Sequence, residues 1–124
     1  MSSTLTKLTA DQVAAYFVNR DEQVFPNSFD GNMKLQKLIV FANLIHLVKN
    51  NELLFEESMY AFRNGIVVEA VRKPYYQNYQ EYIETLKKEP ASYSESELES
   101  LQMSMDLFNN LSARVLSDLH HELE

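Results

Sequence analysis

The sequence predicts a mostly α-helical fold: a compact, single-domain helical bundle of residues 1–124 around one central buried helix, with a possible short β-hairpin. Three observations support this prediction. Only two glycines and three prolines interrupt the 124 residues, which favours long helices over a many-stranded sandwich with frequent tight turns. Residues 33–50 would be apolar on nearly all sides of a helix. The chain can also bury about two-thirds of its unfolded surface, enough to form a core unaided.

The first helix is predicted to begin at Thr9, whose hydroxyl can form a capping box with Gln12, and to end near Asn19. Apolar residues recur within it at helical spacing, so one side should face the core. Residues 25–31 contain a proline, a glycine and two phenylalanines, which predicts a loop.

Residues 33–50 predict the central helix. Because its apolar residues lie around most of the circumference, the rest of the chain must surround it. Its polar residues are seven, three and four positions apart and form one narrow stripe that we expect to face water: Gln36, Asn43, His46 and Asn50. Asn50 and Asn51 together predict the helix end.

The segment after the central helix predicts a small β-element. Residues 53–55 and 59–62 are short apolar runs joined by a Glu-Glu-Ser turn, which indicates a possible β-hairpin. Residues 66–71 are rich in β-branched residues without strict alternation, so we expect a buried helix or strand that ends at Lys73 and Pro74.

The remaining sequence predicts three helices. A tyrosine-rich helix is expected over residues 75–88, before Pro90. The next should cover residues 94–109, with Ser94 and Glu97 as its capping box. Asn109 and Asn110 should separate it from a last helix capped by Ser112.

The composition excludes several classes of protein. Without cysteine the chain has no disulfide, thiolate metal site or thiol nucleophile, which suits a reducing compartment. The first residues lack the features of a signal peptide, so we expect a cytoplasmic protein. The most apolar stretch, residues 35–48, is shorter than the ~20 residues that span a bilayer, so no membrane segment is predicted.

The formal net charge of −7 is unevenly distributed. Residues 1–88 contain ten basic and ten acidic residues, whereas residues 89–124 contain one basic and eight acidic residues. Because nucleic-acid phosphates are bound by lysine and arginine, this distribution argues against a nucleic-acid partner. The acidity is typical of a soluble small domain and also suits a basic partner.

Two groups of residues are candidates for contacts with a protein. Lys34 and Lys37 either meet water or flank a groove that a partner uses. Tyrosines at helical spacing, with basic residues nearby, either pack on the central helix or form an exposed recognition face. The candidate partner-binding residues are Lys34, Lys37, Arg63, Arg72, Lys73, Tyr75, Tyr76, Tyr79 and Tyr82.

The sequence contains no pattern typical of a metal, cofactor or catalytic site. His120 and His121 are adjacent and therefore point about 100° apart on a helix, and no further ligand completes a set. His46 stands alone on the central helix, where we expect a structural role. No nucleophile elbow, phosphate-binding glycine loop or dinucleotide fingerprint is present. We therefore expect no cofactor, no metal and no enzymatic activity, with a small hydrolase as the reserve hypothesis.

Three segments resemble the Panacea domain, found in SocA-like and GepA-like antitoxins of prophages and bacterial toxin–antitoxin operons. Residues 34–42 resemble the Lys-Leu-Gln-Lys-Leu start of the family's central helix. Residues 54–55 and 59–68 are similar to its Leu-Phe, Ala-Trp and Gly-Pro-Val-Val runs, and residues 112–121 to its closing Ser-Ala, Leu-Ser and Thr-His stretch. The residues that carry the motifs are Leu35, Gln36, Phe62, Gly65, Val67 and His121.

The chain also departs from the family pattern at three positions. Phe62 stands where tryptophan is usual, Ile66 replaces a proline, and His120 replaces a threonine.

The resemblance implies an antitoxin that neutralises a cognate toxin by direct contact, or a proteolytic adaptor that delivers the toxin to an AAA+ protease. The alternative is a phage or mobile-element regulatory module that binds another protein without a toxin partner. Neither the partner nor the oligomeric state follows from the sequence.

Overall fold

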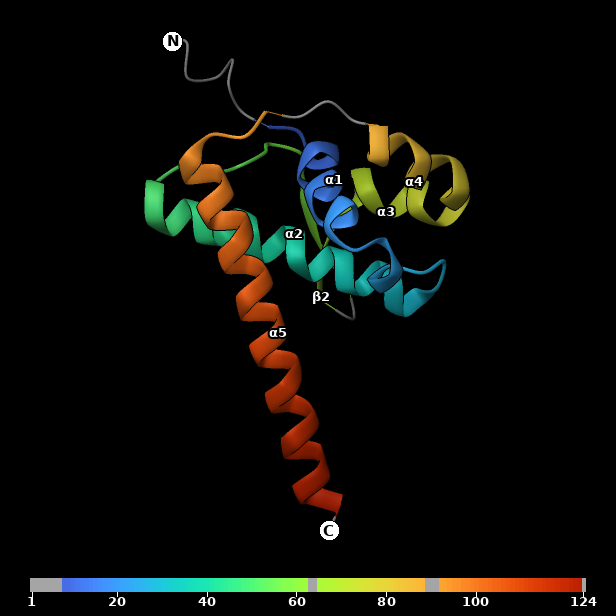
Figure 1. The fold of residues 1–124 in the computed structure, drawn as a ribbon, viewed down its shortest axis with the longest axis vertical. Coiled ribbons are helices and arrows are strands. Elements are labelled where there is room, and N and C mark those ends of the chain that lie inside the picture. Colours follow the sequence, from blue (N-terminus) through green and yellow to red (C-terminus); the bar gives the residue numbers. More distant parts are fainter. Residues whose placement is uncertain (1–7, 63–64, 89–91, 124) are drawn as a thin grey trace.

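The computed structural model describes the backbone of residues 8–62, 65–88 and 92–123, and the side chains of these residues except residue 62 and residues 111–123. The fold is mostly α-helical with one small antiparallel sheet, which confirms the predicted fold class. Figure 1 shows α5 crossing α2, with the C-terminal part of α5 extending beyond the other helices. The elements are α1 (Ala10–Arg20), the 3-10 helix η2 (Glu22–Val24), α2 (Phe29–Asn50), β1 (Met59–Phe62), β2 (Gly65–Val68), α3 (Glu69–Gln77), α4 (Tyr79–Lys88) and α5 (Glu95–Leu123).

Helix α1 forms as its sequence predicts. Thr9 Oγ1 accepts a hydrogen bond from Gln12 N at 3.1 Å, and Gln12 Oε1 accepts from Thr9 N at 2.9 Å, which completes the capping box. Val13 and Phe17, four residues apart, are fully buried on its inner side. No helix among the described residues is long and apolar enough to cross a membrane.

Helix α2 begins at Phe29, earlier than predicted, so Phe29 and Gly31 belong to the helix and not to a loop. Ser28 caps it, because its Oγ accepts from Gly31 N at 3.0 Å. Gly31 allows the preceding turn to lie directly against the helix. A Cβ at this position would lie 2.1 Å from Pro26 O and 2.8 Å from Tyr75 Oη. The Tyr75 hydroxyl donates to the same Pro26 oxygen at 2.6 Å.

We predict that Gly31→Ala lowers the free energy of unfolding by about 1–3 kcal/mol, because the added methyl group must displace either the Pro26 backbone or the Tyr75 hydroxyl. Chemical denaturation measures the effect, and Lys34→Ala, at an exposed position one turn later, is the control. Equal stability of the two variants would contradict this account of the close contact.

The hairpin prediction was wrong in its pairing. β1 contains residues 59–62 as predicted, but its partner is β2, with Met59 opposite Val68 and Phe62 opposite Gly65. The predicted first strand, residues 53–55, is irregular, and Leu54 and Phe55 are buried. Gly65 has φ of +127°, a value that side chains disfavour.

Three other predictions of helix boundaries were wrong. Pro74 does not end the segment that follows β2 but lies within α3, and the predicted helix over residues 75–88 is divided at Asn78 into α3 and α4. Asn109 and Asn110 do not interrupt the last helix, because α5 continues to Leu123. The predicted capping box at its start is confirmed, with Ser94 and Glu97 exchanging two hydrogen bonds.

The polar stripe of α2 faces inward, contrary to the prediction that it meets water. Gln36, Asn43 and His46 are buried, and only Asn50 is exposed. Each buried side chain satisfies polar atoms of another segment, which is why burial is tolerated. Gln36 Oε1 accepts from Val68 N at 2.7 Å, and its Nε2 donates to Val68 O at 3.3 Å.

Asn43 likewise binds the backbone of another segment, residues 54–55, where the sequence had predicted a strand. Its Oδ1 accepts from Leu54 N at 2.7 Å and from Phe55 N at 3.4 Å. On α5, Ser104 Oγ donates to Leu38 O at 2.7 Å. Polar contacts from α2 therefore position the sheet, residues 54–55 and α5.

We predict unequal losses of stability from exchanging the polarity of two neighbouring residues. Asn43→Leu should destabilise the protein by about 1–3 kcal/mol, because it leaves the buried Leu54 and Phe55 N–H groups without an acceptor. Leu44→Asn should change stability by no more than about 0.5 kcal/mol, because Leu44 is 42% exposed. Urea denaturation of both variants tests the inward orientation of the stripe, and a larger effect of Leu44→Asn would refute it.

Candidate functional site

The outer face of α2, opposite the inward polar stripe, is the candidate binding surface. It consists of residues three or four positions apart: Lys34, Lys37, Phe41, Leu44 and Val48. Leu44 is 42% exposed and Val48 is 84% exposed, while Phe41 is half-buried. The expectation that neighbouring segments surround α2 on all sides is therefore wrong for its C-terminal half. Adjacent Leu47 is also exposed.

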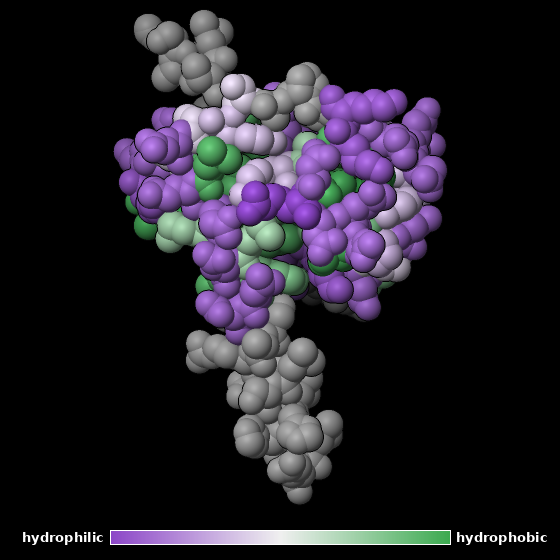
Figure 2. All heavy atoms as spheres, in the orientation of Figure 1, coloured by the Kyte–Doolittle hydropathy of each residue, from purple (hydrophilic) through white to green (hydrophobic). Residues whose placement is uncertain are grey.

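Helix α5 also exposes apolar side chains near the C-terminal end of α2. Lys49 Nζ at the end of α2 pairs with Glu99 Oε1 at 2.6 Å and lies 3.6 Å from Met103 Sδ. Met103 and Leu107, one turn apart on α5, are both exposed. Figure 2 shows hydrophobic atoms among hydrophilic ones in the region where α5 crosses α2. The ion pair with Lys49 lowers the pKa of the Glu99 carboxyl below its ordinary value.

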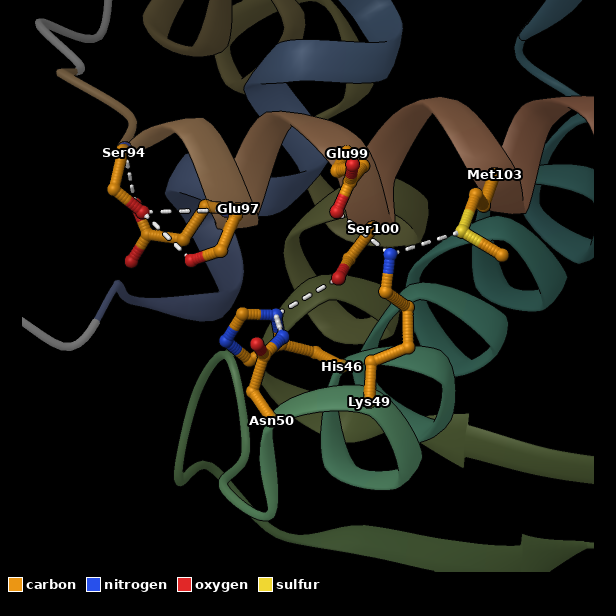
Figure 3. A network of polar contacts seen from close by, with 9 residues as sticks. His46, Lys49, Asn50, Ser94, Glu97, Glu99, Ser100 and Met103 are labelled. Atoms are coloured by element: carbon orange, nitrogen blue, oxygen red, sulfur yellow. Dashed lines mark hydrogen bonds and ion pairs between the residues drawn. The ribbon is translucent and has the colours of Figure 1, made fainter.

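A buried polar network fixes α5 on α2 beside this surface. Figure 3 shows His46 of α2 directed toward Ser100 of α5, with Asn50 in contact with the His46 ring. His46 Nδ1 lies 2.8 Å from Ser100 Oγ and 3.0 Å from Asn50 Nδ2. A serine beside an imidazole can act as a nucleophile and base only where a substrate reaches it. Both side chains are buried between helices, so this pair serves as a structural link.

The two lysines of the outer face are exposed and give its N-terminal end a positive charge. None of the ion pairs found among the described residues involves Lys34 or Lys37. In contrast, Lys49, Arg72 and Lys87 each pair with a glutamate. The positive charges at positions 34 and 37 are therefore available to a partner.

Three of the candidate tyrosines belong to the core and not to a recognition face. Tyr75 donates to Pro26 O and Tyr79 to Phe25 O, both at 2.6 Å, and Tyr82 donates to Asp11 Oδ1 at 2.7 Å. Tyr75 and Tyr82 are buried and Tyr79 is partly buried. Burial raises the pKa of the Tyr75 hydroxyl above its ordinary value. These side chains join α3 and α4 to α1 and to the turn before α2.

The other candidates on α3 form a separate surface cluster. Arg72 makes a two-pronged contact with Glu69, at 2.8 and 2.9 Å, and its guanidinium lies 5.8 Å from the centre of the exposed Tyr76 ring. The arginine lowers the pKa of Glu69 below its ordinary value. Lys73 is exposed, and Arg63 lies outside the described residues.

No group of three or more potential metal ligands occurs among the described residues. The side chains of His120 and His121 lie outside the described part of the chain.

The comparisons with known proteins identify the family. The sequence model of the family described as "Antitoxin SocA-like, Panacea domain" matches residues 35–124, which include most of α2 and all later elements. The chain belongs to this family. No curated protein and no solved structure was found to match the chain. Membership supports an antitoxin-like role, a protein partner and a function other than catalysis.

The motif residues of the Panacea domain that are described here have structural roles. Leu35 is buried, Gln36 holds the Val68 backbone, Gly65 supplies the positive φ at the start of β2, and Val67 is buried. The side chains of Phe62 and His121 are not among those described. Among these residues, Gln36 and Gly65 act at the contact between α2 and the sheet or within the sheet itself.

Sequence reasoning found Lys34 and Lys37 but missed Leu44, Leu47 and Val48, because it assigned every apolar residue of the helix to the core. A signal was present. The helix is too apolar to show which side faces inward, but Asn43 and His46 lie opposite Leu44 and Val48, and both sets cannot be buried unless the helix is fully surrounded.

Proposed function

We propose that this Panacea-domain protein is an antitoxin that neutralises a cognate toxin by direct contact through the outer face of α2 and the exposed Met103 and Leu107 of α5. The observation that supports the proposal most strongly is the orientation of α2. The helix buries amides and an imidazole while it exposes leucine and valine at neighbouring positions. Exposed apolar patches of this kind are typical of protein interaction sites.

The chemistry of the surface supports a protein as its ligand. Its apolar part would be removed from water by an apolar surface of the toxin, the main favourable contribution to association. The lysines at its N-terminal end can pair with carboxylates at the edge of the contact, where charges mainly increase the association rate and selectivity. The basic residues of the face are too few for a nucleic-acid backbone.

We predict that the double variant Leu44→Asp, Val48→Asp loses toxin neutralisation while it remains folded. Replacing central apolar contacts with carboxylates should weaken binding at least about tenfold. The assay expresses the product of the neighbouring open reading frame as the candidate toxin and measures growth rescue, with thermal unfolding of each purified variant.

The matched control is Gln77→Asp, Gln80→Asp, which adds the same charge at exposed positions next to the junction of α3 and α4. Rescue by the control but not by the α2 variant is the expected result. Full rescue by the folded α2 variant would place the toxin contact elsewhere. If the neighbouring product is harmless when expressed alone, the alternative function, a regulatory interaction module without a toxin, replaces the antitoxin proposal.

We further propose that neutralisation acts by sequestration, because a contact surface is all that this mode requires. The toxin half-life in growing cells should then be the same, within about twofold, with and without this protein. Immunoblotting after inhibition of protein synthesis measures it. A toxin half-life that shortens markedly when this protein is present would instead support the adaptor mechanism, in which an AAA+ protease degrades the toxin.

A further inference from the structure

An open cavity of about 160 Å³ lies between the end of α1, η2, α2 and the middle of α5. Asp21 and Asn109 contribute polar groups to it. The rest of the wall consists of apolar side chains: Phe17, Val24, Phe25, Leu38, Met105 and Phe108. Met105 and Phe108 lie on a different side of α5 from Met103 and Leu107, so this cavity is separate from the outer face of α2.

The size and lining of the cavity suit one aromatic ring. An apolar cavity of about 150 Å³ lined by aliphatic and aromatic side chains accepts benzene. Val24, Met105 and Phe108 are only partly buried, so a ring in the cavity would cover apolar surface that the chain leaves accessible. Pockets of this type hold the aromatic side chains that contribute most to many protein complexes.

The charge beside the cavity favours a cationic neighbour of that ring. None of the ion pairs among the described residues involves Asp21, whose Oδ1 accepts only a backbone hydrogen bond, from Gln23 N. The adjacent Arg20 is directed elsewhere, because its guanidinium lies 5.2 Å from the Tyr16 ring centre and donates to Gln102 Oε1. Lys87 pairs with Glu22 at 3.0 Å. A carboxylate is therefore available beside the apolar opening.

We propose that this cavity is a second binding site, which receives an aromatic side chain from a basic protein segment with lysine or arginine next to the aromatic residue. The ring fills the apolar cavity, and the neighbouring cation pairs with Asp21. The proposal does not depend on the antitoxin function.

Short capped peptides test this site directly. The probe is the tripeptide lysine–phenylalanine–lysine, compared with lysine–alanine–lysine and with glutamate–phenylalanine–glutamate. The methyl resonance of Met105, followed by NMR during titration of the full chain, should shift and saturate at millimolar concentrations of the first peptide. The alanine peptide should give no saturable shift, and the acidic peptide should bind about 1.4–5-fold more weakly, the range for one exposed ion pair.

Three variants make the test specific. Asn109→Trp covers the opening and should abolish the shift, whereas Asn110→Trp, at the next exposed position of α5, should preserve it. Asp21→Asn keeps a side chain able to cap η2 and should remove the preference for the basic peptide. Absence of a shift with the lysine–phenylalanine–lysine peptide, or an equal shift in Asn109→Trp, would overturn the proposal without affecting toxin neutralisation.

Discussion

The hydrogen bonds from the inward side of α2 to other segments are the constraint on which this structure depends. Gln36 holds the backbone of Val68, Asn43 holds residues 54–55, and His46 contacts Ser100 of α5. Each contact joins α2 to a segment distant in sequence. These groups are buried, so a slip in register would leave polar atoms without partners, at a cost greater than the value of any single bond. The contacts therefore determine which arrangement of the apolar surfaces is adopted.

The orientation of α2 links the fold to the proposed function. Because the amides and the imidazole must face inward, residues such as Leu44 and Val48 must face outward. The apolar outer face is thus a consequence of the inward hydrogen bonds that orient α2. In the proposed antitoxin function, a toxin could bind this face without any rearrangement of the core. Lys34 and Lys37 extend the same face with charge that the rest of the described chain leaves unpaired.

The sequence predicted the elements that local chemistry determines and failed where contacts distant in sequence decide. The capping boxes at Thr9 and Ser94 were recognised because all of their partners lie within four residues. The strand partner of residues 59–62 was predicted wrongly because residues 53–55 have similar strand character. Backbone contacts with Asn43 and Leu8 hold Leu54 outside the sheet. Asn109 and Asn110 suggested a helix end, but low helix propensity alone does not stop a helix.

Only part of the candidate site could be predicted from the sequence, because contacts distant in sequence decide which side chains are exposed. Lys34 and Lys37 were identified because charged residues at the start of an apolar helix must meet solvent. The tyrosines could not be assigned to core or surface, because an amphipathic tyrosine suits both. The hydroxyls of Tyr75 and Tyr79 find acceptors in the turn before α2, and that turn approaches α3 only because residue 31 is a glycine.

The two sides of α2 are subject to separate selective demands. Asn43 is constrained by backbone groups within this molecule, whereas the next residue, Leu44, is exposed, and under the proposed function only a bound toxin would constrain it. Mutations can therefore accumulate on the outer side without loss of the native state. On such a helix, substitutions on the outer side could change the binding partner while the fold of the protein stays the same.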